Sequence, residues 1–273
     1  MKMSKTMPKT QSTVSQFIED GIVEFNENVN YDTLEIILKS PKIAATTKPG
    51  QFVMLSCQRG NNSLLRRPFS VHDVIGDSIS LLYKVVGIGT EMMENFRIGE
   101  KVSLLGPLGK SFSVAKTKHH CLVGGGIGMA PLLALAKLIR KNDPEAKITT
   151  LQGGQSSRNI LVMDKFTAFG DVFVSTDDGT EGHQGYVTGL LEKMNDDDMA
   201  VYTCGPNVMM KAVTAIAKNM KWPCQISLEA PMACGMGACL GCSFPRAGDH
   251  QGVEKYVHVC KDGPVFKAEE IWD

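Results

Sequence analysis

Short hydrophobic runs alternate with turn residues along the first part of the chain. These runs are rich in β-branched and aromatic residues, and Gly and Asn separate them, a pattern typical of antiparallel strands. Strands are expected over residues 17–25, 31–38, 51–57, 66–74, 78–86 and 101–105, with one short helix near residues 90–96. The pattern predicts an antiparallel β-barrel over residues 16–115, preceded by a flexible polar tail over residues 1–15.

From about residue 116 the pattern changes, and apolar strands alternate with helical segments. Strands are expected at 120–124, 147–152, 171–175 and 200–204, and helices at 129–141, 160–167, 187–194 and 207–220. Such alternation is typical of βαβ units around a parallel sheet. We therefore expect a multidomain β + α/β fold: the barrel, a parallel-sheet domain over residues 116–222, and a small cysteine-bearing domain over residues 223–273.

Composition narrows the class of protein. The chain has 273 residues with 29 Lys and Arg against 29 Asp and Glu, so its formal net charge is zero, which argues against nucleic acid or an anionic membrane as the main partner. The longest uncharged apolar stretch, residues 121–136, contains four glycines and Pro131. It is shorter than the roughly 20 residues of a membrane helix. The N-terminus lacks the apolar core of a secretion signal. These features predict a cytoplasmic location.

A cysteine cluster near the C-terminus carries the strongest chemical signal. Cys234, Cys239 and Cys242 follow the spacing C-x4-C-x2-C, and Cys260 comes 17 residues later. This is the plant-type ferredoxin spacing for a 2Fe-2S cluster. Small residues fill the loop and leave room for an inorganic core. Zinc remains an alternative, although it usually takes two C-x2-C pairs and only one is present, and free core thiols are a second alternative.

Two short motifs on the expected barrel could hold a phosphate and a flat ring. Arg67-Pro68-Phe69-Ser70 combines a cation, an aromatic ring and a hydroxyl. Downstream, Leu82-Tyr83-Lys84 precedes Gly87-Ile88-Gly89-Thr90, a glycine turn that opens a helix. Each could also be a simple structural turn. Together on one barrel, they favour a dinucleotide.

Two further motifs lie in the expected α/β domain. Residues 124–131, GGGIGMAP, follow a strand and open a helix, which is the context of a nucleotide-binding turn. The turn departs from G-x-G-x-x-G, and no Asp or Glu ends the second strand, so it could also be a tight turn without a ligand. Cys204-Gly205-Pro206 ends a later strand. Cys204 could contact a nicotinamide ring, or be a small buried hydrophobe.

The combination of RPFS on a barrel, GGGIGMAP and CGP resembles the ferredoxin–NAD(P)H reductase superfamily. ACGMGACLGC followed by VCKDGPVF is similar to one family within it, the electron-transfer subunits of two-subunit, NAD-dependent dihydroorotate dehydrogenases. The resemblance implies that FAD is held by Arg67, Pro68, Phe69, Ser70, Leu82, Tyr83, Lys84, Gly89 and Thr90. It implies that NAD faces Gly124, Gly125, Gly126, Ile127, Gly128, Gly205 and Pro206, with Cys204 as a catalytic residue. It also implies that Cys234, Cys239, Cys242 and Cys260 ligate the 2Fe-2S cluster.

The resemblance also implies a function. An FMN-containing catalytic subunit would oxidise dihydroorotate in pyrimidine (UMP) biosynthesis, and electrons would pass through the cluster and FAD to NAD+. The expected assembly is a heterotetramer with two copies of each subunit. Alternatives are a hydrogenase-, sulfite reductase- or transhydrogenase-type reductase subunit with the same cofactors, or a non-catalytic redox regulator. NADP also stays open, because Ser157-Arg158 follows the second strand and could meet a 2′-phosphate.

Overall fold

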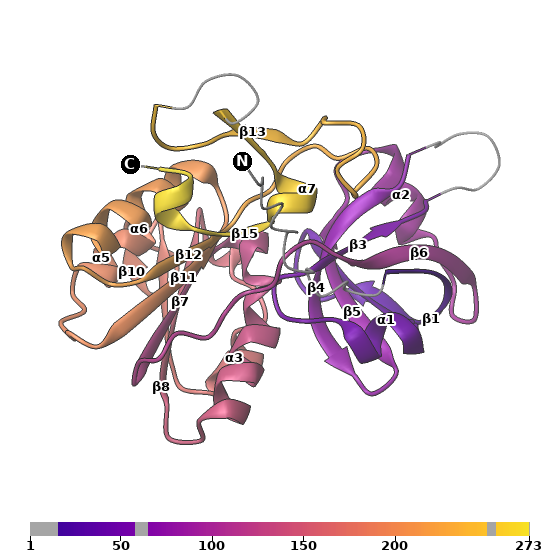
Figure 1. The fold of residues 1–273 in the computed structure, drawn as a ribbon. Helices are drawn as coiled ribbons and strands as arrows, with labels where there is room; N and C mark the ends of the chain where they lie inside the picture. The colour runs from indigo at the N-terminus through magenta and orange to yellow at the C-terminus, as the bar shows by residue number, and fades with distance from the viewer. Residues whose placement is uncertain (1–15, 58–64, 250–254, 273) are drawn as a thin grey trace, which may run out of the picture.

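The computed structural model describes residues 16–57, 65–249 and 255–272. A β-barrel and an α/β unit lie side by side, and the C-terminal segment packs along the top of both (Figure 1). The tail predicted over residues 1–15 lies outside the described residues.

Six antiparallel strands form a closed barrel in the order β1-β2-β5-β4-β3-β6. They are β1 (Phe17–Asn28), β2 (Thr33–Lys39), β3 (Phe52–Leu55), β4 (Arg67–Ile75), β5 (Ser78–Lys84) and β6 (Lys101–Leu108). The ring closes because β6 pairs with both β1 and β3. Side chains such as Ile36, Leu81 and Leu104 are fully buried and fill the interior. The predicted antiparallel barrel is confirmed.

The barrel carries two short helices, α1 (Pro41–Thr46) and α2 (Ile88–Glu94), where the sequence predicted only the second. Helix α1 begins with Pro41, whose fixed φ suits a first turn. The Glu19 carboxylate accepts hydrogen bonds from the backbone N–H groups of Lys42 and Ile43, at 3.2 and 3.1 Å. Because this cap comes from a distant strand, local sequence could not reveal the helix.

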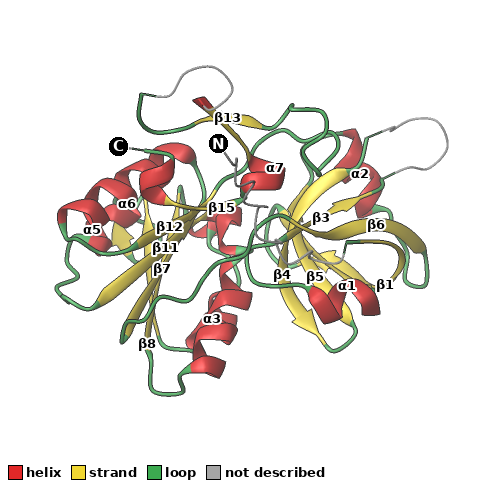
Figure 2. Cartoon of the chain, in the orientation of Figure 1, coloured by secondary structure: helices red, strands yellow, loops and turns green. Residues whose placement is uncertain are grey.

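The second unit is a seven-stranded sheet in the order β10-β9-β8-β7-β11-β12-β15. All neighbours are parallel except β12 and β15. The strands are β7 (His119–Gly125), β8 (Lys147–Gly154), β9 (Asp171–Thr176), β10 (His183–Gln184), β11 (Met199–Cys204), β12 (Cys224–Ser227) and β15 (Val265–Lys267). The helices are α3 (Leu132–Asn142), α4 (Met163–Thr167), α5 (Val187–Leu191) and α6 (Asn207–Asn219). Figure 2 shows the strands β7, β8, β11 and β12 in yellow, with α3 on one side and α5 and α6 on the other. Two 3₁₀ turns, η1 (Gly126–Met129) and η2 (Ser157–Asn159), follow β7 and β8. The βαβ pattern correctly predicted the parallel sheet.

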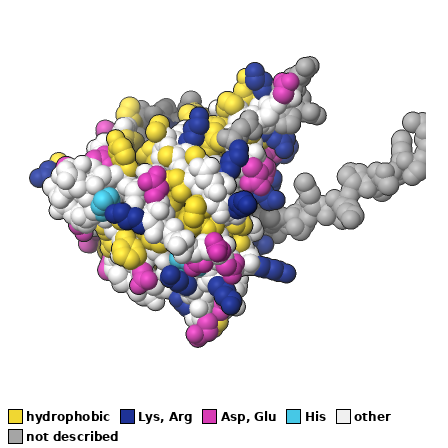
Figure 3. Space-filling view, turned by 90° about the vertical axis from the view of Figure 1, so that its left-hand side faces the viewer, with side chains coloured by type: hydrophobic (Ala, Val, Ile, Leu, Met, Phe, Trp, Pro, Cys, Tyr) yellow, Lys and Arg dark blue, Asp and Glu magenta, His cyan; other side chains and the backbone are white. Residues whose placement is uncertain are grey.

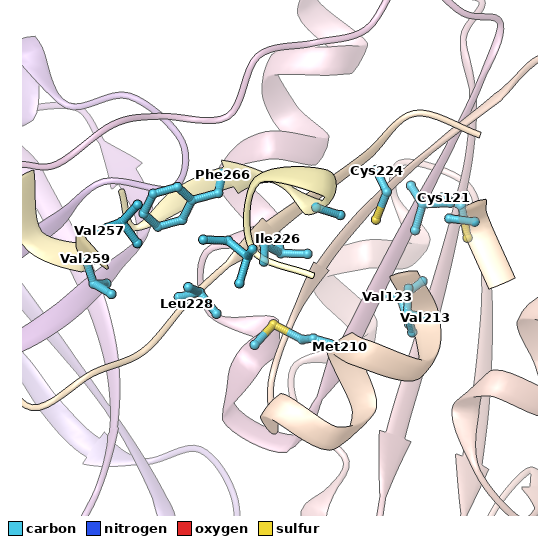
Figure 4. Close-up of a cluster of buried hydrophobic side chains, with 14 of the residues drawn as sticks. Cys121, Val123, Met210, Val213, Cys224, Ile226, Leu228, Val257, Val259 and Phe266 are labelled. Carbon is cyan, nitrogen blue, oxygen red and sulfur yellow. The ribbon is translucent and has the colours of Figure 1, made fainter. Parts of the chain in front are cut away.

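The sheet extends beyond residue 222, where the sequence placed a boundary. Strand β12 pairs with β11, and β15 returns to pair with β12. Figure 4 shows Cys121 of β7 and Cys224 of β12 in one buried cluster with Phe266 and Val259. The cysteine-bearing segment is therefore packed on the hydrophobic core of the sheet. Both cysteines are buried free thiols.

The C-terminal segment has little regular structure. It contains β13 (Ser243–Pro245), β14 (Tyr256–His258), α7 (Val259–Asp262) and η4 (Ala268–Glu270), and β13 pairs with β14. On the face shown in Figure 3, acidic and basic side chains are interspersed with hydrophobic ones. Among the described residues, no helix is long and apolar enough to cross a membrane.

Candidate functional site

A cavity of about 530 Å³, which we call the barrel cavity, lies against β4 and β5. Seven residues predicted from the sequence line it: Pro68, Phe69, Ser70, Leu82, Tyr83, Lys84 and Thr90. The two motifs meet because β4 and β5 are antiparallel neighbours. Residues 228–232 and Pro264 complete the wall from the opposite side. The barrel cavity is thus shared between the barrel and the C-terminal segment.

Aromatic packing shapes the floor of the barrel cavity. The ring of Phe69 meets the ring of Tyr83 edge-on, with centroids 6.1 Å apart and an interplanar angle of 69°. The Tyr83 hydroxyl donates to Asn26 Oδ1 at 2.8 Å, and burial raises the pKa of Tyr83. The hydroxyl therefore stays neutral. The two packed rings give the cavity a rigid apolar wall.

Arg67 and Gly89 do not line the barrel cavity but contact each other at its side. A Cβ atom on Gly89 would lie 3.1 Å from Arg67 Nε, so the guanidinium packs against the first turn of α2. The Thr90 hydroxyl accepts from the Val86 N–H at 2.9 Å and the Gly87 N–H at 3.2 Å, which fixes that turn. The Arg67 guanidinium therefore lies beside an ordered turn, an arrangement that suits phosphate binding.

A second cavity of about 950 Å³, the sheet cavity, lies at the carboxyl ends of the parallel strands. Ligands of α/β sheets bind at this edge. The sheet cavity is lined by six predicted residues: Gly125, Gly126, Ile127, Gly128, Gly205 and Pro206. Gly124 is not among the lining residues, because the Met129 side chain packs directly behind it.

The glycine turn and β11 are in close contact. A Cβ on Gly128 would lie 2.5 Å from the Cys204 carbonyl carbon and 2.6 Å from Gly205 Cα. Gly126 has a φ of +52°, and a Cβ there would meet nothing within 4 Å. Gly128 is thus required for packing, whereas Gly126 is required for backbone conformation.

Cys204 is 1% exposed and lines neither cavity. Burial, together with the nearby Glu229 carboxylate, raises the pKa of the Cys204 thiol, so the thiol is neutral. Its predicted catalytic contact with nicotinamide stays a prediction.

The two cavities share Lys84, Ile127 and Glu229, so they meet at a common junction. Lys84 Nζ is paired with Asp32 Oδ2 at 2.8 Å. The Glu229 side chain is exposed to the cavities, yet surrounding protein desolvates the carboxylate and raises its pKa. Glu229 was not predicted from the sequence. It follows β12, and only its place at the carboxyl end of a parallel strand could have indicated it.

The four cysteines predicted to be ligands lie in and beside one loop. Cys242 and Cys260 are 2% exposed, with their sulfur atoms 3.2 Å apart, whereas Cys234 is half-buried and Cys239 is exposed. The Cys239 thiol hydrogen-bonds to that of Cys234. The thiols therefore form two pairs, which is how a two-iron cluster distributes four thiolates between its irons.

Backbone N–H groups point at the cysteine sulfur atoms. Gly237 donates to Cys260 Sγ at 3.0 Å, and Ala238 and Cys239 donate to Cys234 Sγ at 3.3 and 3.4 Å. Backbone donors, chiefly Met236, lower the pKa of Cys234 to about 6. Burial and the neighbouring Cys242 raise the pKa of Cys260 to about 12. Donors of this kind stabilise thiolate and sulfide charge.

Two glycines bend the cysteine loop sharply. Gly235 and Gly237 have φ of +72° and +83°, and a Cβ on them would lie 2.5 Å from Met54 Cγ and 2.7 Å from Lys261 Cδ. These glycines let the loop bend tightly against the barrel.

A barrel with a ring-sized cavity, a sheet with a glycine-lined cavity and a paired-cysteine loop define a nicotinamide-linked flavin reductase that carries an iron–sulfur cluster. Two protein-family models match the chain. Residues 229–272 match the iron–sulfur cluster binding domain of dihydroorotate dehydrogenase B, and residues 122–215 match the oxidoreductase NAD-binding domain.

Curated relatives extend this match over most of the chain. The dihydroorotate dehydrogenase B (NAD(+)) electron transfer subunit of Caldanaerobacter subterraneus is 41% identical over 82% of this chain and 86% of its own. The corresponding subunit of Fusobacterium nucleatum is 36% identical over 93% of this chain and 98% of its own. The chain belongs to this family of electron transfer subunits. An electron transfer subunit works with a catalytic partner subunit.

Solved structures support the fold. A chain of the NADH-dependent reduced ferredoxin-NADP oxidoreductase superposes with a TM-score of 0.79 at 27% identity, covering 92% of this chain and 89% of that one. An Amycolatopsis cytochrome P450 reductase superposes with a TM-score of 0.67 at 19% identity, covering 77% and 68%. The 2Fe-2S cluster, FAD and NAD expected from the sequence agree with the family and the fold.

Proposed function

We propose that this chain accepts electrons one at a time at the cysteine loop and delivers them in pairs to NAD+ through FAD held in the barrel cavity. The observation that carries this proposal is the continuity of the three sites. Residues 230–232 line the barrel cavity, and Cys234 follows two positions later. At its other side, the barrel cavity meets the sheet cavity at Lys84, Ile127 and Glu229.

Bound FAD would supply the conversion between one-electron and two-electron transfer. The residues of this chain would bind and orient the reactants. Phe69 and Tyr83 would support the flat ring of the flavin, and Arg67 beside the Gly89 turn would hold its phosphates. Leu228 and Met232 would cover the ring from the C-terminal side and exclude water.

The sheet cavity would hold the nicotinamide nucleotide. Gly125, Gly126, Gly128 and Gly205 would leave the backbone accessible to a pyrophosphate, because these four residues carry no side chain. The junction at Ile127 and Glu229 would bring the nicotinamide ring next to the flavin. Hydride transfer needs such contact between the two rings.

The catalytic partner would dock over the cysteine loop. Met236 is 49% exposed and Leu240 is 57% exposed, and both flank the exposed Cys239. Exposed apolar side chains around a redox loop favour a protein partner over water. We propose an FMN-containing dihydroorotate dehydrogenase subunit as that partner, in a cytoplasmic heterotetramer with two copies of each chain that serves UMP biosynthesis. Oxidation of dihydroorotate to orotate releases two electrons and two protons; NAD+ takes up both electrons and one proton.

The experiment is to purify the tagged chain anaerobically from its own cells, with whatever partner it retains. NADH formation from NAD+ is followed after dihydroorotate is added, and NADH-to-dye reduction serves as the control. The proposal predicts that both reactions proceed. If only the dye reaction proceeds, the flavin and NAD sites stand and the dihydroorotate partner is wrong. A co-purified hydrogenase or sulfite reductase subunit would then identify the alternative.

A further inference from the structure

The sheet cavity has an uneven distribution of charge. Among its described lining residues, the charged side chains are Lys84, Glu229 and Asp177. Lys84 and Glu229 also line the barrel cavity, so they lie at the junction. Asp177 is therefore the one charged group that the described residues contribute to the rest of the sheet cavity.

The backbone around Asp177 is firmly placed. Asp177 follows β9, and its N–H donates to the Gly154 carbonyl at the end of β8 at 3.0 Å. The neighbouring carboxylate, that of Asp178, accepts hydrogen bonds from the N–H and the hydroxyl of Thr180, at 3.0 and 2.6 Å. These bonds stabilise the turn itself. The Asp177 carboxylate has no hydrogen-bond partner among the described side chains. It is thus free to receive a donor from a ligand.

Arg158, the cation that the sequence offered for a 2′-phosphate, points elsewhere. Arg158 does not line the sheet cavity, although its neighbour Asn159 does. The Arg158 guanidinium lies over the Tyr31 ring, 5.1 Å from the ring centroid. Asn30 Nδ2 donates to the carbonyl oxygens of Arg158 and Ile160 at 2.7 and 2.6 Å. The turn between β1 and β2 therefore clamps this arginine against the barrel.

NAD and NADP differ only at the 2′-position of the adenosine ribose, where NADP carries a phosphate. A carboxylate accepts a hydrogen bond from a 2′-hydroxyl and repels a 2′-phosphate, whereas an arginine favours the phosphate. We propose that Asp177 selects NAD over NADP in the sheet cavity, while Tyr31 and Asn30 hold Arg158 out of reach of the nucleotide. The inference rests on the proposed NAD site and names the residues that determine its specificity.

In the sequence, residues 176–179 (TDDG) end a strand and could line a nucleotide pocket or form a plain turn. The expected position for an acidic residue is the end of the second strand, where Gly153 and Gly154 stand. Strand pairing places Thr176 beside Gly154, so the carboxylate of Asp177 comes from the neighbouring strand instead.

The test compares Asp177→Ser with a matched control, Asp197→Ser, which removes an exposed carboxylate outside both cavities. For each purified protein, kcat/KM is measured for NADH and NADPH with a dye acceptor, and NAD+ and NADP+ binding is measured by calorimetry. Asp177→Ser should lower the preference for NADH by on the order of tenfold or more, the worth of one hydrogen bond to a charged group. Asp197→Ser should keep the preference of the parent protein.

A second variant tests the clamp. Adding Tyr31→Ala to Asp177→Ser releases Arg158 and should tighten NADP+ binding further. No additional gain would refute the role of the clamp. The Asp177 assignment is wrong if Asp177→Ser keeps the preference for NADH over NADPH within about twofold of the parent. If the serine variant does not fold, Asp177→Asn is measured in its place. A parent protein that prefers NADPH also refutes the assignment. Failure of NADH to reduce dye in the parent would instead refute the proposed NAD site itself.

Discussion

Replacing Gly128 by alanine should damage the nucleotide site through steric overlap alone. The new Cβ would lie 2.5 Å from the Cys204 carbonyl carbon and 2.6 Å from Gly205 Cα, where ordinary contact begins at 3.4 Å. Both atoms are backbone, so no flexible side chain can yield. The glycine turn would have to move away from β11 by about 1 Å, and a misplacement of this size can cost about 100-fold in activity. Overpacking of this kind also destabilises by about 1–3 kcal/mol.

Gly76→Ala, in the turn between β4 and β5, is the control. Gly76 lines neither cavity, and a Cβ there meets nothing within 4 Å, so only the left-handed backbone, with φ of +58°, penalises it, by about 1 kcal/mol. The assay is kcat/KM for NADH with a dye acceptor, together with thermal unfolding and the flavin and cluster absorbance. Gly128→Ala should lose NADH activity far more than Gly76→Ala, with both chromophores retained. Equal losses in the two variants would refute the steric argument.

Two further predictions concern stability. Burial raises the pKa of Glu229 in the folded protein, so its contribution to stability is present below its unfolded pKa and is lost as the pH rises through the folded value. Glu229→Gln should therefore melt higher than the parent at about pH 8 and nearly the same at about pH 4, and an equal difference at both would contradict this. Ile226→Ala, in the core beneath the cysteine segment, should lower the free energy of unfolding by about 2–5 kcal/mol in urea titrations. Ile18→Ala, at a side chain that is 73% exposed, should have little effect, and similar losses in both would refute the packing argument.

Local patterns were sufficient for the fold class and the cluster. The strands of the barrel alternate with turns, and three of the four predicted ligand cysteines, Cys234, Cys239 and Cys242, lie within one short loop. Helix α1 escaped prediction because Glu19, its cap, is contributed by a distant strand.

The nucleotide site was only partly predictable, because it too combines residues that are distant in sequence. Gly125 and Gly205 belong to local motifs, and both line the sheet cavity. Residues 176–179 could already be proposed as pocket lining from their place at a strand end, whereas Glu229 is recognised as a lining residue only from the structure. For Cys204 the sequence left two interpretations open, a nicotinamide contact or a small buried hydrophobe, and the structure shows that the side chain is buried. The individual ligand contacts of the site residues stay predictions.

The relay is tested most directly by Cys239→Ser in the complex with its partner. This substitution removes one thiolate of the cysteine loop and leaves every residue that lines the two cavities in place. The account predicts that NADH formation driven by dihydroorotate is abolished while NADH-to-dye reduction continues at the parent rate, because FAD and NAD would still meet at the junction of the two cavities, at Ile127 and Glu229. Equal loss of both activities, or dihydroorotate-driven NADH formation that persists without the cluster, would contradict it.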